Sequence, residues 1–229
     1  GFSNAVADKV FSLIEKFVGY GFNKAHSASY AMIAYHTAYM KAKYPVEFMT
    51  AVFTAESRSM SGPAGSEKMA QAILECRRMK IQLLPPSINK SDIEFTINKD
   101  KASVQGIIRF GLSAIKNVGT AAIDSILKAR EKEGSFKSFT DFVSRVDLSK
   151  VNKKTFESLI KSGAMDEFGS RAALLSAFPA IVDKIHEKTK NTLEGQDSLF
   201  AMDEDLGIQD NLPKVEELSK EELLLFAKY

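Results

Sequence analysis

The sequence contains no tryptophan, one cysteine (Cys76) and no apolar run long enough to cross a bilayer. A single cysteine excludes an internal disulfide and a zinc site built from several thiolates. The three histidines, His26, His36 and His186, are scattered and have no cysteine or histidine partner close in the sequence. We therefore expect no metal site in these 229 residues and a reduced, cytoplasmic setting.

The composition, 45% hydrophobic and 26% charged, is that of an ordinary globular protein with one large core or two small ones. The net charge of +2 conceals an asymmetry along the chain. Residues 1–190 hold 28 Lys and Arg against 19 Asp and Glu, a net +9, whereas residues 191–229 hold 3 against 10, a net −7. A positive body favours a polyanionic partner, and the acidic tail favours a different one.

Apolar residues recur at helical spacing over most of the chain, which predicts a mainly α fold. The expected helices cover residues 2–18, 28–44, 45–56, 67–79, 112–115, 120–133, 151–161, 170–178 and 218–229. The small and polar residues 57–66 predict a loop. Residues 93–97 and 104–110 alternate like strands and predict a short β-hairpin that turns at 99–101.

The stretch Gly19–Pro45 places polar residues where a long helix is expected to begin. Ser27 is the expected N-cap, and Pro45 disfavours helical geometry in Tyr44. Lys24 and His26 would then lie at or just before a helix N-terminus, whose free N–H groups favour a phosphate. The tyrosines and methionines of residues 32–40 are expected in a core.

The segment LSAIKNVGTAAIDSIL, residues 112–127, resembles a helix-hairpin-helix motif, whose core is h-x-x-h-x-G-h-G. Gly119 matches the second glycine, and Asn117 replaces the first, where it can adopt a positive φ. The backbone N–H groups of such a turn point outward together and can hold a phosphate oxygen. The residues expected to do so are Lys116, Asn117, Val118, Gly119 and Thr120.

A second, more degenerate hairpin is expected at Lys161, Ser162, Gly163 and Ala164, although no G-h-G is present there. Two interpretations stay open for both expected hairpins. They bind the DNA backbone as a tandem, or their glycines merely end the helices of a plain bundle.

The residues Gly19, Tyr20, Gly21, Phe22, Asn23, Lys24, His26 and Tyr30 form the pattern GYGFNK-x-H-x-x-x-Y. This pattern, with LPPSINKSD at 84–92, resembles the bacterial replicative DNA polymerase III α subunit of the DnaE type. The resemblance implies that Asn23, Lys24, His26 and Tyr30 lie on a fingers surface that faces the incoming nucleotide and the template. It also implies that the Mg²⁺-binding aspartates lie in a palm domain before Gly1. We therefore expect no catalytic residue or cofactor here, and no activity of this piece alone.

The same resemblance implies a domain order along the chain. Residues 1–84 would be a distal part of the fingers, and 85–110 a connector with the β-hairpin. Residues 111–190 would form the tandem helix-hairpin-helix domain. Residues 191–213 would be an acidic linker, followed by a helix at 214–229 that leads to a further domain.

Inside that linker, Gln196, Ser198, Leu199 and Phe200 belong to the pentapeptide QDSLF. It is similar to the clamp-binding motif Q-x-(S/D)-L-F of bacterial replication proteins. Such a peptide binds in extended form and buries its Leu-Phe pair in a pocket of the partner. The alternative is that Leu199 and Phe200 fold back onto the body of this chain.

The expected partners are duplex DNA without sequence preference, the sliding clamp, and the rest of the polymerase and its holoenzyme, with no membrane. Two other functional classes stay open: a non-catalytic helix-hairpin-helix module of a repair protein, and a helical scaffold protein. Salt-dependent affinity for duplex DNA would separate the repair module from the scaffold.

Overall fold

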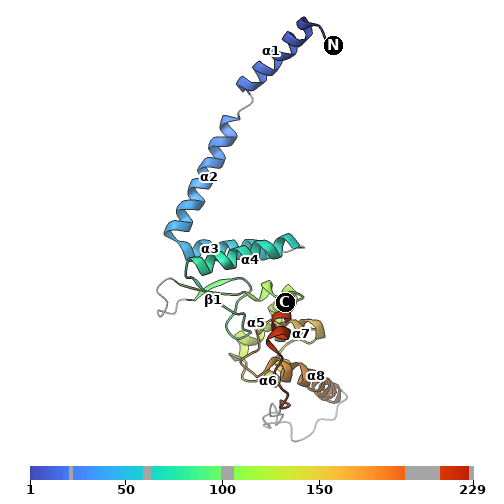
Figure 1. Cartoon of the computed structure of the whole chain (residues 1–229). Helices are drawn as coiled ribbons and strands as arrows, with labels where there is room; N and C mark the ends of the chain where they lie inside the picture. The colour runs from blue at the N-terminus through green and yellow to red at the C-terminus, as the bar shows by residue number, and fades with distance from the viewer. Residues whose placement is uncertain (21–22, 59–62, 99–105, 194–211, 227–229) are drawn as a thin grey trace. The chain divides into compact units, whose positions relative to one another are not determined.

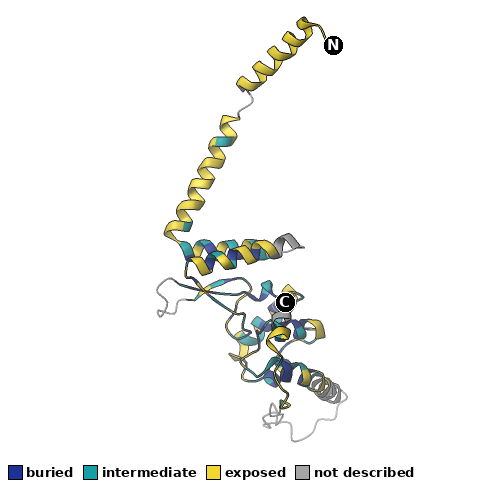
Figure 2. Cartoon of the chain, in the orientation of Figure 1, coloured by how far each residue is buried: buried dark blue, intermediate teal, exposed yellow. Residues whose placement is uncertain are grey.

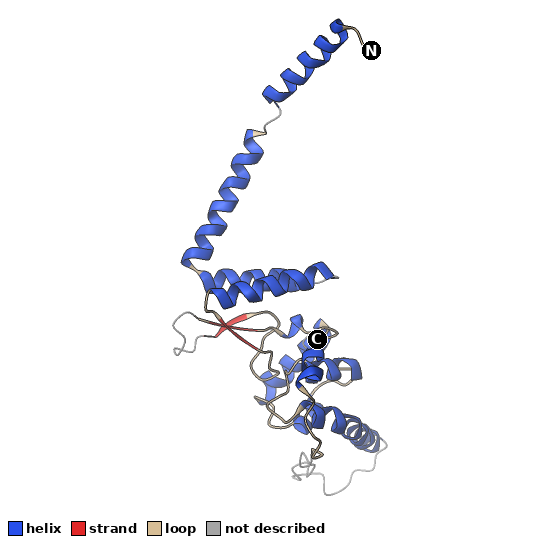
Figure 3. Ribbon diagram, in the orientation of Figure 1, coloured by secondary structure: helices blue, strands red, loops and turns tan. Residues whose placement is uncertain are grey.

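The computed structural model describes residues 1–20, 23–58, 63–98, 106–193 and 212–226. The fold in these ranges is mainly α, as the sequence predicts, with one small three-stranded sheet (Figure 3). The chain divides into two compact units, Gly1–Phe48 and Met49–Tyr229, each described by itself below. No helix within the described ranges is long and apolar enough to cross a membrane.

The first unit contains α1 (Asn4–Tyr20) and α2 (Lys24–Lys43) (Figure 1). The expected cap at Ser27 is wrong, because Asn23 is the N-cap and its side chain accepts a hydrogen bond from the His26 N–H at 3.0 Å. Asparagine caps helices at least as well as serine does, so the helix begins earlier than expected. Helix α2 ends before Tyr44, whose φ of −132° and ψ of 59° are not helical, as Pro45 predicts.

No residue of α2 is buried, which contradicts the expectation of a core at residues 32–40 (Figure 2). Ile33, Tyr35 and Met40 are all exposed. The physical reason is that apolar side chains lie on every side of this helix, so one neighbouring helix cannot cover them. Helices of this kind are normally buried in a larger protein.

Two helices follow, α3 (Pro45–Arg58) and α4 (Pro63–Arg78), each with a proline at its first position. The loop expected at 57–66 is shorter than predicted, because residues 57–58 end α3 and residues 63–66 begin α4. Residues 59–62 of that loop lie outside the described residues. Phe53 on α3 and Cys76 on α4 are fully buried.

Three short strands form the sheet: β1 (Gln82–Leu84), β2 (Thr96–Asn98) and β3 (Ile107–Arg109). Their order is β1-β3-β2, with β2 antiparallel and β1 parallel to β3. The pairing of β2 with β3 confirms the predicted hairpin, although its turn at 99–101 lies outside the described residues. The parallel strand β1 was not predicted.

Aromatic side chains join α3 to the sheet region. The Phe53 ring stacks on Phe95 at a centroid distance of 5.0 Å, and Phe110 packs against Phe95 at 4.8 Å. Helix α4 also packs against β1. Helices α3 and α4, which belong to the expected fingers portion 1–84, therefore pack with the connector.

The remaining core belongs to the helical domain, whose buried positions run from Ile88 to Phe178. Its elements are the 3₁₀ turn η1 (Leu112–Ala114), α5 (Thr120–Glu133), α6 (Phe139–Arg145), α7 (Lys153–Lys161) and α8 (Arg171–Leu193). Helix α5 has the predicted bounds. Helix α6 was not predicted, and α8 continues past Pro179 beyond its predicted end.

Partly buried hydrogen bonds between side chains and backbone join the connector to this helical domain. The Arg130 guanidinium on α5 donates to the carbonyl oxygens of Ile88 and Ser91 at 3.0 and 2.7 Å. The Asn89 side chain donates to the Phe136 carbonyl and accepts from the Phe136 N–H. The connector and the hairpins therefore form one framework.

The segment before α9 (Lys220–Phe226) also belongs to this framework. Leu212 packs against the helical core, and a Glu217 carboxylate oxygen accepts from the Ala172 N–H, at the start of α8, at 3.3 Å. Of the predicted linker 191–213, residues 191–193 are helical and Leu212 packs against the core; 194–211 lie outside the described residues.

Candidate nucleic-acid interface

The first hairpin turn joins η1 to α5 through Lys116, Asn117, Val118 and Gly119. Asn117 has a φ of 65°, the left-handed conformation that the sequence predicts for it. Val118 is buried, and its N–H donates to the Ile115 carbonyl at 3.2 Å. Gly119 is the N-cap of α5 with extended backbone angles, φ −82° and ψ 162°, so it does not need a positive φ. Asn117 is therefore the one residue of this turn that takes the left-handed conformation.

The outer side of this turn carries backbone N–H groups without acceptors. Within the part of the chain that the structure describes, the N–H groups of Asn117, Gly119, Thr120 and Ala121 make no hydrogen bond. Gly119, Thr120 and Ala121 are exposed, and Asn117 is half-buried. Those of Thr120 and Ala121 belong to the first turn of α5, and those of Asn117 and Gly119 directly precede it, where the helix dipole favours an anion. This corner can accept a phosphate oxygen.

The second hairpin does not lie where the sequence analysis put it. The N–H groups of Ser162, Gly163 and Ala164 donate to carbonyls of α7, those of Ser158, Ile160 and Leu159 respectively. This is the pattern that closes a helix C-terminus around a residue of positive φ, here Gly163 at 83°. Gly163 and Ala164 are also buried, so these residues offer no outward amides for a phosphate.

A closer structural match to the first turn joins α6 to α7. Val151 is buried like Val118, and Asn152 is an extended N-cap, φ −78° and ψ 171°, like Gly119. The Asn152 side chain accepts from the Thr155 N–H at 3.0 Å. In the described structure the N–H groups of Lys153 and Lys154, the first two residues of α7, find no acceptor. The sequence does contain a signal for this turn, since SKVN at 149–152 parallels KNVG at 116–119.

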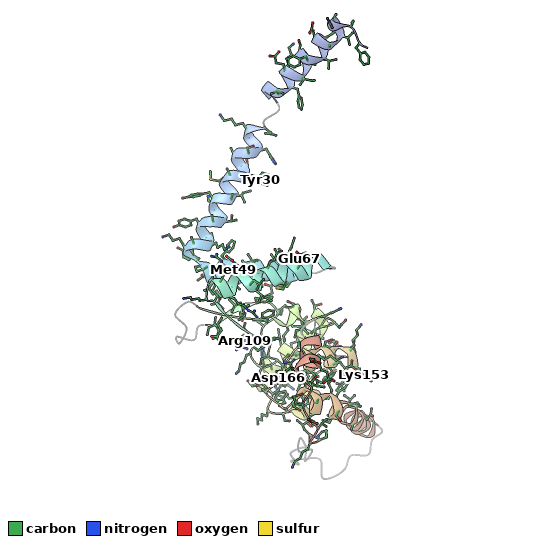
Figure 4. All side chains as sticks on the ribbon, in the orientation of Figure 1. Tyr30, Met49, Glu67, Arg109, Lys153 and Asp166 are labelled. Carbon is green, nitrogen blue, oxygen red and sulfur yellow. The ribbon has the colours of Figure 1, made fainter. Side chains whose placement is uncertain are left out.

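The two turns line one open groove with a volume of about 400 Å³. Its walls are formed by Asn117, Val118, Gly119, Ala121, Ala122, Lys150, Asn152 and Thr155. The N-cap of α5, Gly119, and the N-cap of α7, Asn152, therefore line a shared space, as does Ala121 with its free amide. Lys116, Lys150, Lys153 and Lys154 are exposed on these two turns (Lys153 is labelled in Figure 4). Amides and ammonium groups both suit phosphate oxygens.

One carboxylate balances part of this charge. Hydrogen bonds from the Ser149 hydroxyl at 2.6 Å, from Lys150 at 2.9 Å and from the Ser149 N–H at 3.0 Å lower the pKa of Asp147 to about 2. Asp147 is therefore ionised at neutral pH and neutralises the ammonium of Lys150. The exposed Lys153 and Lys154 have no such ion pair in the described structure.

The residues expected to face nucleotide and template lie at the start of α2. Asn23, Lys24, His26 and Tyr30 are all exposed, and the His26 and Tyr30 rings pack together at 4.4 Å (Tyr30 is labelled in Figure 4). Because Asn23 caps the helix, it already occupies the His26 N–H. The side chains of Lys24, His26 and Tyr30 lie on the surface of the first unit and not in a core.

Two further expectations concern the clamp-binding motif and metal binding. Gln196, Ser198, Leu199 and Phe200 lie outside the described residues. Within the described ranges, no group of three or more His, Cys, Asp or Glu side chains comes together in a way that could hold a metal ion.

Comparisons with known proteins match the same parts of the chain. A family model described as a helix-hairpin-helix motif matches residues 80–174, which contain both turns of the groove. The DNA polymerase III subunit alpha of Campylobacter jejuni is 42% identical over 231 residues, covering 100% of this chain and 18% of that protein. That of Thermus aquaticus is 42% identical, covering 85% and 15%. That of Pseudomonas aeruginosa is 35% identical, covering 98% and 20%. The chain thus spans between 15% and 20% of the length of these relatives.

Proposed function

Because this chain belongs to the family of DNA polymerase III α subunits, we propose that it is the part of a replicative DNA polymerase that holds duplex DNA by its phosphates. One observation carries this proposal. The N-caps of α5 and α7, Gly119 and Asn152, line one groove, and in the described structure the first two helical amides beside each N-cap are free. Two adjacent anion sites suit a polyanion better than a single small ligand.

The chemistry of the groove favours binding without sequence preference. Backbone amides and lysines bind phosphate oxygens, which fix the position of a protein on DNA but carry no sequence information. A few phosphate contacts give affinities of about 10⁻⁴–10⁻⁶ M at physiological salt, with a log–log salt slope of about −0.9 for each contact. The groove therefore positions duplex DNA and does not select a sequence.

The first unit has a separate role in this proposal. Asn23, Lys24, His26 and Tyr30 face the incoming nucleotide and the template, and the exposed apolar surface of α2 docks on the part of the polymerase beyond these residues. Nucleotide transfer and its Mg²⁺ ions belong to that other part. The location of such an enzyme is cytoplasmic.

Gln196, Ser198, Leu199 and Phe200 bind the sliding clamp in the same proposal. The sequence pattern supports this role, together with the acidic and polar composition around a Leu-Phe pair. An isolated apolar pair in such a segment suits insertion into a partner's pocket.

The alternatives of a repair module and of a scaffold protein are less well supported. A hairpin module would account for residues 80–174, but the Campylobacter jejuni relative matches this chain over its whole length, α1 and α2 included. A scaffold would not require free amides and lysines around one groove.

Two matched charge changes test the proposal. Lys153→Gln removes a cation at the start of α7, whereas Lys128→Gln removes one eight residues into α5, about 12 Å along the helix from its start. Fluorescence anisotropy with a labelled duplex, repeated over a range of salt, gives affinity and salt slope. We expect Lys153→Gln to flatten the slope by about 0.9 and Lys128→Gln to change it less. Duplex binding that is absent, or independent of salt, would contradict the proposed function.

A further inference from the structure

The described chain buries only four polar side chains: Ser91, Thr140, Thr155 and Ser158. Two of them, Thr155 and Ser158, lie three residues apart on α7 and therefore on the same side of that helix. The residues that follow them on α7, Phe156 and Leu159, are apolar and buried. A buried hydroxyl is costly unless it is hydrogen-bonded, so these two positions call for a specific partner.

Both hydroxyls have the same partner, Asn117 of the first hairpin turn. The Thr155 hydroxyl donates to the Asn117 carbonyl at 3.2 Å, and the Ser158 hydroxyl accepts from the Asn117 side-chain amide at 3.1 Å. Helix α7 thus holds the backbone and the side chain of the one left-handed residue in that turn. An L-residue other than glycine rarely takes this conformation unless its surroundings fix it.

Thr155 also contacts the second turn. Its hydroxyl lies 3.3 Å from the Asn152 side-chain oxygen, which accepts the Thr155 N–H at 3.0 Å. One buried residue therefore touches both the left-handed corner before α5 and the N-cap of α7. Thr155 lies at the groove that the two turns share.

We propose that Thr155 and Ser158 are positioning residues for DNA binding, which hold Asn117 left-handed and set the two phosphate-binding turns in a fixed relation. They reach no phosphate themselves. Their effect is to hold the N-caps of α5 and α7 at the groove, with the free amides beside each N-cap in a fixed relation, before DNA arrives. This inference rests on the proposed function of the groove.

Substitutions at Thr155 separate positioning from packing. Thr155→Val keeps the shape of the side chain and removes the hydroxyl, whereas Thr155→Ser keeps the hydroxyl. In the full 229-residue chain, we expect Thr155→Val to weaken binding of a labelled duplex by about tenfold and to flatten the salt slope by up to about 0.9. Thr155→Ser should retain most of the affinity and slope. A residue important only for stability would change the melting temperature and leave the salt slope of the folded protein unchanged.

A double-mutant cycle tests the role of Ser158 and does not depend on Thr155→Val folding. Glycine takes a positive φ without support. Ser158→Ala should therefore weaken duplex binding when residue 117 is Asn and should have no effect in the Asn117→Gly protein. An equal effect in both proteins would overturn the inference for Ser158.

The outcomes also distinguish this inference from the proposed function. If the wild-type chain shows no salt-dependent duplex binding, the proposed function fails. If the wild type binds as expected and Thr155→Val binds with the same affinity and slope, only the positioning inference fails.

Discussion

Gly119→Asp should stabilise the protein while weakening its hold on DNA. Gly119 is the N-cap of α5, its φ and ψ are open to any residue, and an added Cβ would have no heavy atom within 4 Å. The change therefore fits without strain. An aspartate at an N-cap accepts a hydrogen bond from the first turn of the helix, so it places a carboxylate where a phosphate is expected to bind.

The gain in stability has three parts. Aspartate caps a helix better than glycine by a few tenths of a kcal/mol. Its charge at the positive end of the helix adds about 0.3–1 kcal/mol, and loss of glycine freedom in the unfolded chain adds about 0.4–1 kcal/mol. A total of about 1–2 kcal/mol should raise the melting temperature by several degrees.

The loss in DNA affinity follows from the same carboxylate. Because the carboxylate accepts from the free N–H of Ala121 and places a negative charge beside that of Thr120, one phosphate contact should disappear, and the salt slope should flatten by about 0.9. A charge-assisted hydrogen bond contributes about 1.5–3 kcal/mol, and 1.4 kcal/mol is a factor of ten. Duplex binding should therefore weaken by about 10- to 100-fold.

Two controls make the assay specific. Gly119→Ala adds a side chain without a cap and should bind the duplex like the wild type, whereas Gly119→Asn adds the cap without the charge. Anisotropy titrations and thermal unfolding of all four proteins give affinity, slope and stability. If Asp and Asn bind the duplex equally, and both as well as Ala, the amides of this corner hold no phosphate.

Two further predictions concern other parts of the chain. The folded pKa of Asp147, about 2, lies below its ordinary value of 3.8, so its contribution to stability is full well above pH 4 and is lost as the pH falls through 2. The melting temperature of the wild type should exceed that of Asp147→Asn at pH 6, and the difference should close by about pH 2; a difference that stays constant would contradict this. Leu199→Ala combined with Phe200→Ala should abolish binding to an immobilised sliding clamp and leave duplex affinity unchanged, whereas Leu206→Ala in the same segment should bind normally. Unchanged clamp affinity of the double variant would exclude these residues as the clamp site.

Local chemistry made the first turn predictable from the sequence. The signals for this turn lie within three residues, Asn117, Val118 and Gly119. Asparagine accepts a positive φ, and Asn117 is left-handed as predicted. The bounds of α5 follow from the same signals. What could not be read locally is the support of Asn117, because Thr155 and Ser158 lie about forty residues further on.

The second turn was misplaced because a glycine of positive φ serves two purposes. Gly163 ends α7 by directing its neighbours' amides back into the helix, whereas a hairpin turn directs them outward. The sequence does not show which of these occurs. The repeated pattern around Val118 and Val151 would have identified the correct turn, had the two segments been aligned with each other.

Elements defined by distant partners were also missed. Strand β1 has three residues and pairs with β3 about twenty-five residues later, so no local periodicity reveals it. Helix α6 has only seven residues, although Ser138 and Asp141 mark its start, where the Ser138 side chain accepts from the Asp141 N–H. The exposure of α2 could not be predicted either. An apolar sequence indicates that a helix is covered by other elements, but it does not indicate whether those elements lie within these residues.

In the proposed function, free amides at the starts of α5 and α7 hold the phosphates of duplex DNA. A titration of the ¹⁵N-labelled chain with a short duplex, followed by two-dimensional ¹H–¹⁵N NMR, observes those amides directly. The account predicts that the signals of Gly119, Thr120, Lys153 and Lys154 shift together, while that of the buried Ala164 stays in place. Shifts at Ala164 with none at Gly119 and Thr120 would contradict it.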